Sequence, residues 1–135
     1  MALWTVTDAA RCAAQALRDE PARRSGAFRC LLQLLDDYVR AVRDGGPPAG
    51  AALFQDPPPV TGDSGVDAAL AALGEHLARR DGWRPPSWTF DERRYAEPWW
   101  FVSGVRAWHA MALVESPLAF RKRGVFVTSS ALERV

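Results

Sequence analysis

Several residue types are scarce in this 135-residue sequence, and their scarcity excludes whole classes of protein. Two cysteines are too few for a fold that is built on a framework of disulfides. No apolar run reaches the roughly 18 residues that a membrane-spanning helix needs. The longest run, 98–105, contains Ser103 and Gly104 and is followed by Arg106. We therefore expect a protein with no membrane partner.

An excess of charge of one sign is also lacking. The chain has 17 basic and 16 acidic side chains, and its net charge of +1 gives no global attraction for nucleic acid or an anionic membrane. The only histidines are His76 and His109, and neither belongs to a spacing typical of metal ligands. Glycine-rich phosphate loops and nucleophile motifs are missing too. The sequence thus offers no catalytic residues, and we predict no metal site and no cofactor.

The N-terminus carries no pattern typical of a signal peptide. Charged residues arrive early, at Asp8 and Arg11, before any apolar stretch. This predicts a cytoplasmic protein, in which Cys12 and Cys30 are unpaired thiols because the cytosol keeps cysteines reduced. A bridge between the two helices that carry these cysteines is the alternative. Isoleucine and asparagine are absent and Lys122 is the only lysine, a bias typical of a GC-rich bacterial genome.

The spacing of apolar residues predicts an all-α fold, a bundle of four main helices with short helices beside them. The main helices are expected at 8–20, 25–44, 64–80 and 98–114. The fourth is apolar nearly all round, so we expect it in the middle of the domain with Trp108 as the central core ring. A short helix is expected at 116–124. One short strand is expected near 125–127, where valines flank a phenylalanine.

Capping signals mark the ends of two of these helices. Thr5 or Thr7 can accept a hydrogen bond from the first turn of the first helix. Asp63 or Ser64 can do the same for the helix at 64–80, and Gly82 can terminate it. These residues predict helix boundaries that are independent of the apolar pattern.

We read residues 1–135 as a single domain with three stretches. The first, 1–44, is a helical hairpin. The second, 45–62, is a connector rich in proline and glycine, with a short helix near 49–54. The third, 63–135, is a helical unit rich in tryptophan.

Five of the six tryptophans lie between positions 83 and 108. We expect these rings to belong either to the core or to an interaction surface. Trp83 and Trp88 flank two prolines, and we expect both to be partly exposed. Trp99 and Trp100 are adjacent, so on a helix their rings point about 100° apart and cannot share one core. We take these four as interface candidates, since aromatic residues often anchor interfaces. An aromatic pocket near Trp99, Trp100 and His109 is the alternative.

The densest positive charge is the block Arg121, Lys122 and Arg123. One interpretation is a contact with phosphate or nucleic acid. The other is a solvated helix end, where cations suit the helix dipole. No motif of a known nucleic-acid-binding fold accompanies the block.

Two sequence blocks suggest a family. Residues 86–89 read Pro-Ser-Trp-Thr, and residues 116–126 read Ser-Pro-Leu-Ala-Phe-Arg-Lys-Arg-Gly-Val-Phe. From about residue 59 to residue 135 the chain resembles an uncharacterised small-protein family of high-GC bacteria that shares P-x-W-T and S-P-x-A-F-R-x-R-G-V-F blocks. Some such proteins are encoded beside toxin–antitoxin or regulatory genes. The resemblance implies a toxin-neutralising or regulatory partner and assigns no catalytic residue.

The leading prediction is a non-catalytic cytoplasmic protein that acts by protein–protein interaction, with a protein partner or as a homodimer. The absence of catalytic residues and the aromatic excess at 83–108 support it. One alternative is a nucleic-acid-binding regulator that uses the block at 121–123. Another is a small-molecule-binding protein or an enzyme that uses the aromatic pocket.

Overall fold

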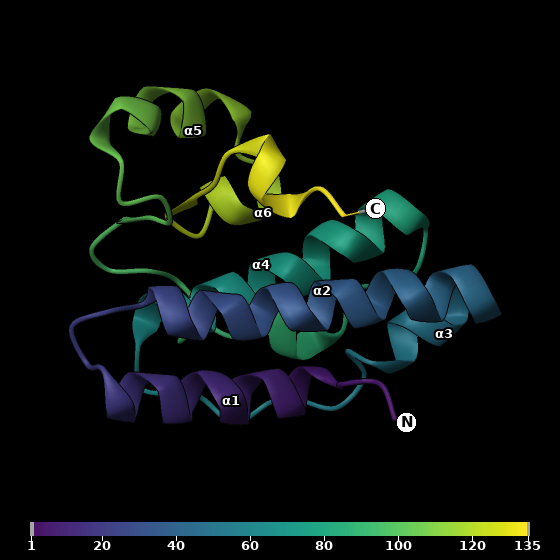
Figure 1. Cartoon of the computed structure of the whole chain (residues 1–135). Helices are drawn as coiled ribbons and strands as arrows, with labels where there is room; N and C mark the ends of the chain where they lie inside the picture. The colour runs from purple at the N-terminus through teal and green to yellow at the C-terminus, as the bar shows by residue number, and fades with distance from the viewer. Residues whose placement is uncertain (1, 135) are drawn as a thin grey trace.

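The structure is a computed structural model that describes residues 2–134. Helices α1 (Val6–Asp19) and α2 (Ser25–Gly45) form an antiparallel hairpin, and α4 (Ser64–Asp81) packs against both (Figure 1). The short helix α3 (Pro47–Ala52) follows α2 and packs against it. The predicted class, a mostly helical fold with main and short helices, is confirmed.

After α4 the chain forms only short elements. They are the 3₁₀ turn η1 (Ser87–Phe90), strand β1 (Trp100–Phe101), the 3₁₀ turn η2 (Arg106–Trp108), helices α5 (His109–Glu115) and α6 (Leu118–Arg121), strand β2 (Val125–Phe126) and the 3₁₀ turn η3 (Ser129–Leu132). The two strands pair in parallel, with Trp100 opposite Val125 and Phe101 opposite Phe126. The strand expected near 125–127 is therefore confirmed. No helix within residues 2–134 is long and apolar enough to cross a membrane.

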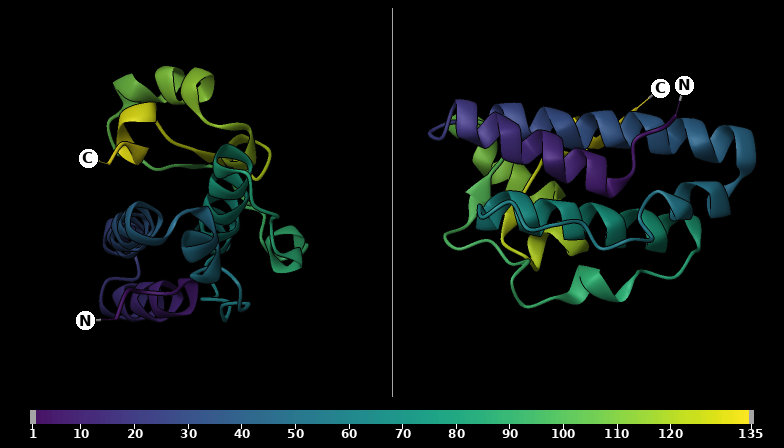
Figure 2. Two further views of the ribbon diagram at one scale, coloured as in Figure 1. Left: turned by 90° about the vertical axis from the view of Figure 1, so that its right-hand side faces the viewer. Right: turned by 90° about the horizontal axis from the view of Figure 1, so that it is seen from below.

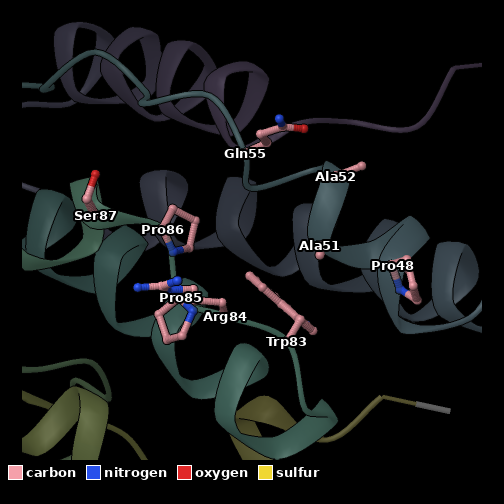
Figure 3. A pocket seen from close by; sticks show the side chains of 9 residues that line it. All are labelled: Pro48, Ala51, Ala52, Gln55, Trp83, Arg84, Pro85, Pro86 and Ser87. Carbon is pink, nitrogen blue, oxygen red and sulfur yellow. The ribbon is translucent and has the colours of Figure 1, made fainter.

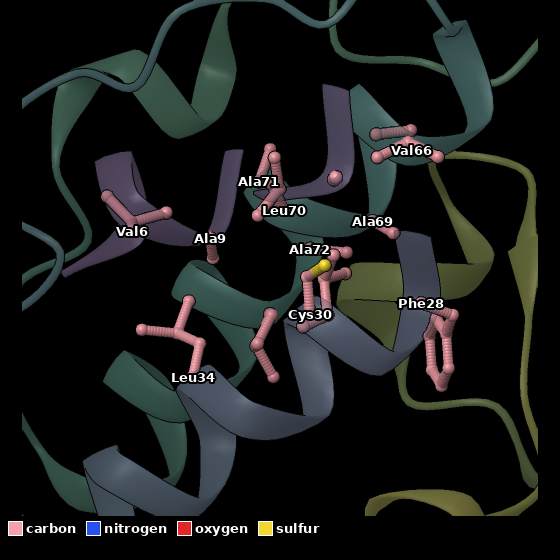
Figure 4. Close-up of a cluster of buried hydrophobic side chains, with 14 of the residues drawn as sticks. Val6, Ala9, Phe28, Cys30, Leu34, Val66, Ala69, Leu70, Ala71 and Ala72 are labelled. Carbon is pink, nitrogen blue, oxygen red and sulfur yellow. The ribbon is translucent and has the colours of Figure 1, made fainter. Parts of the chain in front are cut away.

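Helix α4 is the central element of the core. Figure 2 shows it between the α1–α2 hairpin and the C-terminal elements. Nearly every residue of α4 from Gly65 to Ala78 is buried, and its alanines let neighbouring helices approach closely. Large side chains of α2 such as Phe28 and Leu34 fill the space beside it (Figure 4). An apolar helix does occupy the middle of the domain, but it is α4.

The predicted helix at 98–114 is wrong in its first half. The N–H of Trp100 donates to the carbonyl oxygen of Gly124 at 2.8 Å, and the N–H of Val102 donates to that of Phe126 at 3.0 Å. These bonds hold the backbone extended beside β2. Pairing with a distant strand therefore overrides a local apolar pattern that reads as helical. Only the last part, α5, is an α-helix.

Trp108 is consequently not a core residue. Its side chain is 51% exposed, because η2 and α5 lie over the outside of the β1–β2 sheet and not inside the bundle. The expectation of a central Trp108 ring depended on a continuous helix through the core.

The capping predictions are confirmed. Thr5 caps α1, and its side chain and that of Asp8 each accept a hydrogen bond from the other's backbone N–H. The Asp63 carboxylate accepts from the N–H of Val66 at 3.0 Å and caps α4. Gly82 follows α4 with a φ of 82°, the left-handed conformation that favours glycine.

The expectation of two unpaired cysteines is wrong in this structure. Cys12 of α1 and Cys30 of α2 form a disulfide, with their Cα atoms 5.9 Å apart. The short 20–24 turn folds α2 back along α1 and places the two residues at facing positions of the hairpin. Sequence spacing alone does not show which helix faces meet.

Candidate interaction surface

Exposed apolar side chains concentrate in one region, residues 99–118, which we call the cap. Among residues 2–134, seven of the ten large apolar side chains that are exposed belong to it. These seven are Trp99, Val105, Trp108, Met111, Leu113, Val114 and Leu118. Within the cap, α5 lies far from α1, on the outer side of the molecule (Figure 1). Concentrations of exposed apolar surface of this kind mark sites of interaction.

Helix α5 and the turn before it carry an exposed stripe with helical spacing. Ala107, Ala110, Met111 and Val114 stand at positions i, i+3, i+4 and i+7, and all four are exposed. Val114 has 79% of its side chain accessible. The inward face is marked by Ala112, which is buried. This spacing is typical of a helix face that packs against another element, yet nothing in residues 2–134 covers it.

Polar contacts fix the C-terminal end of α5 in place. Ser116 Oγ accepts a hydrogen bond from the N–H of Val127 at 2.8 Å and donates to the carbonyl oxygen of Ala112. Glu115 Oε1 accepts from the N–H of Ser129 at 2.8 Å and from its hydroxyl at 3.0 Å. The outer face of α5 is thus presented on a helix tied to the sheet and to the C-terminal turn.

A row of aromatic rings supports the cap from below. The His109 ring stacks on Phe101 with centroids 4.3 Å apart, and Phe101 stacks on Phe126 at 5.0 Å. Trp99 meets Phe126 edge-on at 5.1 Å. A cavity of about 210 Å³ lies beside these rings and includes His109, but neither Trp99 nor Trp100 lines it. This volume is below the roughly 300 Å³ from which small-molecule pockets usually start.

The structure separates the four tryptophan candidates. Trp99 is 66% exposed and Trp100 only 7%, so the adjacent rings lie in different environments, although on extended backbone and not on the expected helix. Trp100 packs edge-on against Phe28 in the core. The expectation that Trp88 is partly exposed is wrong: the ring is buried, and its Nε1 finds a partner there by donating to the carbonyl oxygen of Phe54 at 2.8 Å. Of the four, only Trp99 belongs to the exposed cap surface.

Trp83 is half-buried and is one of the side chains that line a second surface feature, an open groove of about 630 Å³ (Figure 3). The groove runs between α3 and the segment 83–87. Trp83 Nε1 donates to the Tyr38 hydroxyl at 2.8 Å, and that hydroxyl donates to Asp81 Oδ2 at 2.6 Å. Burial, together with the hydrogen bond to Asp81, raises the pKa of Tyr38. The Trp83 ring is therefore held in one orientation by the core beneath it.

The basic block has an internal role that the sequence did not reveal. Arg123 is fully buried, and its guanidinium lies 2.7 Å from Glu75 of α4. Lys122 lies 2.7 Å from the same carboxylate, and Arg79 lies 2.6 Å from it. Burial opposes ionisation of Glu75, but hydrogen bonds from Lys122, Arg123 and Arg79 outweigh it and lower its pKa to about 2. The cluster joins α4 to α6.

Only Arg121 of the block has an exposed side chain without such a partner in residues 2–134. Phosphate binding needs several accessible cations, since each one contributes separately to affinity. The arrangement therefore favours a structural role for Lys122 and Arg123. Their neighbours along the sequence give no sign that Glu75, 47 residues or more away, is their partner.

Sequence reasoning missed Met111, Leu113, Val114 and Leu118 as surface residues. The missed signal was the all-round apolar character of 98–114, which fits an exposed face as well as a central helix.

Comparisons with known proteins add no assignment. No protein-family model matches the chain, and no significant similarity to a curated protein or a solved structure is found. Within residues 2–134, no three His, Cys, Asp or Glu side chains lie close enough together to hold a metal ion.

Proposed function

We propose that this protein acts by binding another polypeptide through the cap. The observation that carries the proposal is the exposed stripe of Ala107, Ala110, Met111 and Val114 on a helix that is anchored from below. An apolar face left in water costs free energy that a partner recovers by covering it. From the sequence resemblance we further propose that this protein is itself a toxin-neutralising or regulatory partner of the polypeptide it binds.

The test uses a photoreactive amino acid, benzoyl-phenylalanine, in place of single residues. Position 114 lies on the exposed stripe, and Val60, 43% exposed in the connector, is the control outside the cap. We expect cross-linked products from position 114 and none from position 60 when the protein is irradiated in its native host cells. Absence of products at 114, or equal products at both positions, would refute the role of the cap.

A cytoplasmic location is also part of the proposal. Thiols stay reduced in the cytoplasm. A protein there would carry the Cys12–Cys30 pair, which is bridged in this structure, in its reduced form. Because Cys30 is buried, maleimide is added to cells lysed directly in denaturant. Two labelled cysteines support the cytoplasm, and none supports an oxidising compartment.

A further inference from the structure

The groove beside Trp83 has the make-up of a small-molecule site. We propose that it binds a planar aromatic ring that carries a carboxylate. The proposal goes beyond the function proposed for the cap and is independent of it, because α3 and α5 lie on opposite sides of the molecule (Figure 1). The groove's volume of about 630 Å³ falls within the roughly 300 to 1,000 Å³ that is usual for sites of this kind.

The two sides of the groove are apolar and stiff. The side chains that form them are Pro48, Ala51 and Ala52 from α3, and Pro85 and Pro86 from the segment opposite. The proline ring fixes the backbone φ angle, and alanine has no side-chain rotamers to lose. Figure 3 shows the Trp83 ring between the two sides in that view. A ligand therefore meets surfaces that lose little freedom when it binds.

Trp83 presents carbon to the groove, because its polar edge is already used. Its Nε1, the only hydrogen-bond donor of the ring, donates to the Tyr38 hydroxyl at 2.8 Å. Phe54 and Tyr38 pack against the ring with centroids 5.8 Å and 6.2 Å away. Among the described residues that line the groove, Trp83 is the only aromatic one. It thus offers one stacking surface, which fits one aromatic ring better than a proline-rich peptide that needs an aromatic-lined groove.

Arg84 gives the groove its charge. It is the only charged residue among the described residues that line the groove, it is exposed, and it forms no ion pair within residues 2–134. The nearest acid along the chain, Asp81, is bonded to Arg80 at 3.0 Å and to Tyr38 at 2.6 Å. An unpaired guanidinium beside apolar walls matches an apolar ligand with an anionic group, and its planar fork binds a carboxylate through two hydrogen bonds. One cation balances one negative charge, which favours a carboxylate over a phosphate dianion.

Two neutral side chains complete the polar part of the groove. Gln55 and Ser87 both line it, both are exposed, and neither side chain bonds to another residue in the described range 2–134. Each can donate a further hydrogen bond to a bound carboxylate. Apolar walls with a few polar groups are typical of small-molecule sites.

The first experiment titrates 1-naphthoate into the full chain in a calorimeter. We expect a dissociation constant of about 0.1 mM, which is usual for a ligand of this size. 1-Naphthalenemethanol keeps the rings without the charge and should bind about tenfold more weakly. Decahydro-1-naphthoate keeps the charge without the flat ring and should bind about fivefold more weakly. No detectable binding of 1-naphthoate, or equal binding of either analogue, overturns the proposal.

Two variants locate the binding. Arg84→Gln removes the charge and should weaken the binding of 1-naphthoate about tenfold, while the neutral alcohol binds as before. Arg11→Gln, which changes an exposed arginine of α1 outside the groove, is the matched control and should bind like the wild type. Ala52→Trp fills the groove and should abolish binding of all three probes. Because Ala52 is exposed, this variant keeps its fold, which circular dichroism checks. Unchanged binding of 1-naphthoate by either groove variant overturns the proposal.

Two other occupants of the groove are outcomes of the same tests. A decaproline peptide that binds more tightly than 1-naphthoate would assign the groove to a proline-rich polypeptide. A wild-type dimer that Ala52→Trp converts to a monomer, as light scattering would show, assigns the groove to a second copy of the chain. Either result overturns the proposal. Neither bears on the cap, which is tested separately at position 114.

Discussion

The buried Glu75–Arg123 pair supports a quantitative prediction about stability. Replacing Arg123 with Met removes the 2.7 Å contact with Glu75 and the hydrogen bonds to the carbonyl oxygens of Ala119 and Thr89. Breaking a buried ion pair from one side costs about 3 to 5 kcal/mol. We expect the lower end, about 3 kcal/mol, because Lys122 still neutralises the carboxylate.

Urea unfolding at pH 7, followed by tryptophan fluorescence and circular dichroism, measures this loss. The double variant Glu75→Met with Arg123→Met replaces the pair with apolar side chains. It should lose clearly less than the two single variants together, since neither partner is left as an unpaired buried charge. A loss below about 1 kcal/mol for Arg123→Met alone would refute the reasoning.

The Glu75–Arg123 pair also makes the stability of the fold depend on pH. The pKa of Glu75 falls from its ordinary value of 4.5 to about 2 in the folded protein. A lowered folded-state pKa adds stability above the unfolded-state pKa, here about 3 kcal/mol, and that stability is lost as pH falls from about 5 to 2. Glu75→Gln should flatten this part of the stability curve. An equally steep curve in the variant would assign the acid sensitivity to other carboxylates.

Three further substitutions test the core. Tyr38→Phe leaves Trp83 Nε1 without its acceptor and should cost about 1 to 3 kcal/mol of unfolding free energy, with a shift in tryptophan emission. Replacing Cys12 and Cys30 with Ser opens a bridge between residues 18 apart and should cost about 3 kcal/mol relative to the oxidised protein, as urea unfolding will show. Gly50→Ala sets a Cβ 2.6 Å from a Val42 methyl carbon, so thermal unfolding should reveal a loss of about 1 to 3 kcal/mol. An unchanged midpoint in any of these would contradict the contact concerned.

Local signals predicted the parts of the fold whose partners lie nearby in the chain. The capping residues Thr5 and Asp63 bond within three residues of themselves, and Gly82 ends α4 through its own backbone freedom. The strand at 125–127 was recognisable because β-branched and aromatic residues favour extended backbone. Such interactions need no knowledge of the rest of the chain.

The candidate site was predicted only in part. Trp99 and Trp100 were predicted to diverge on a helix; they do diverge, but because Trp100 belongs to strand β1. Which of them is exposed depended on the pairing of β1 with β2, whose residues are 25 positions apart. The cap itself could not be predicted, since its exposure follows from that same pairing.

The sequence by itself determined the helical class, the ends of α4, and the near balance of charge. Each follows from periodicity, from capping bonds a few residues long, or from composition. Only the tertiary structure decided that Arg123 lies in the core beside Glu75, that Cys12 meets Cys30, and that α5 presents an uncovered apolar face. These outcomes depend on which surfaces meet after distant segments pack, and local sequence patterns do not contain that information.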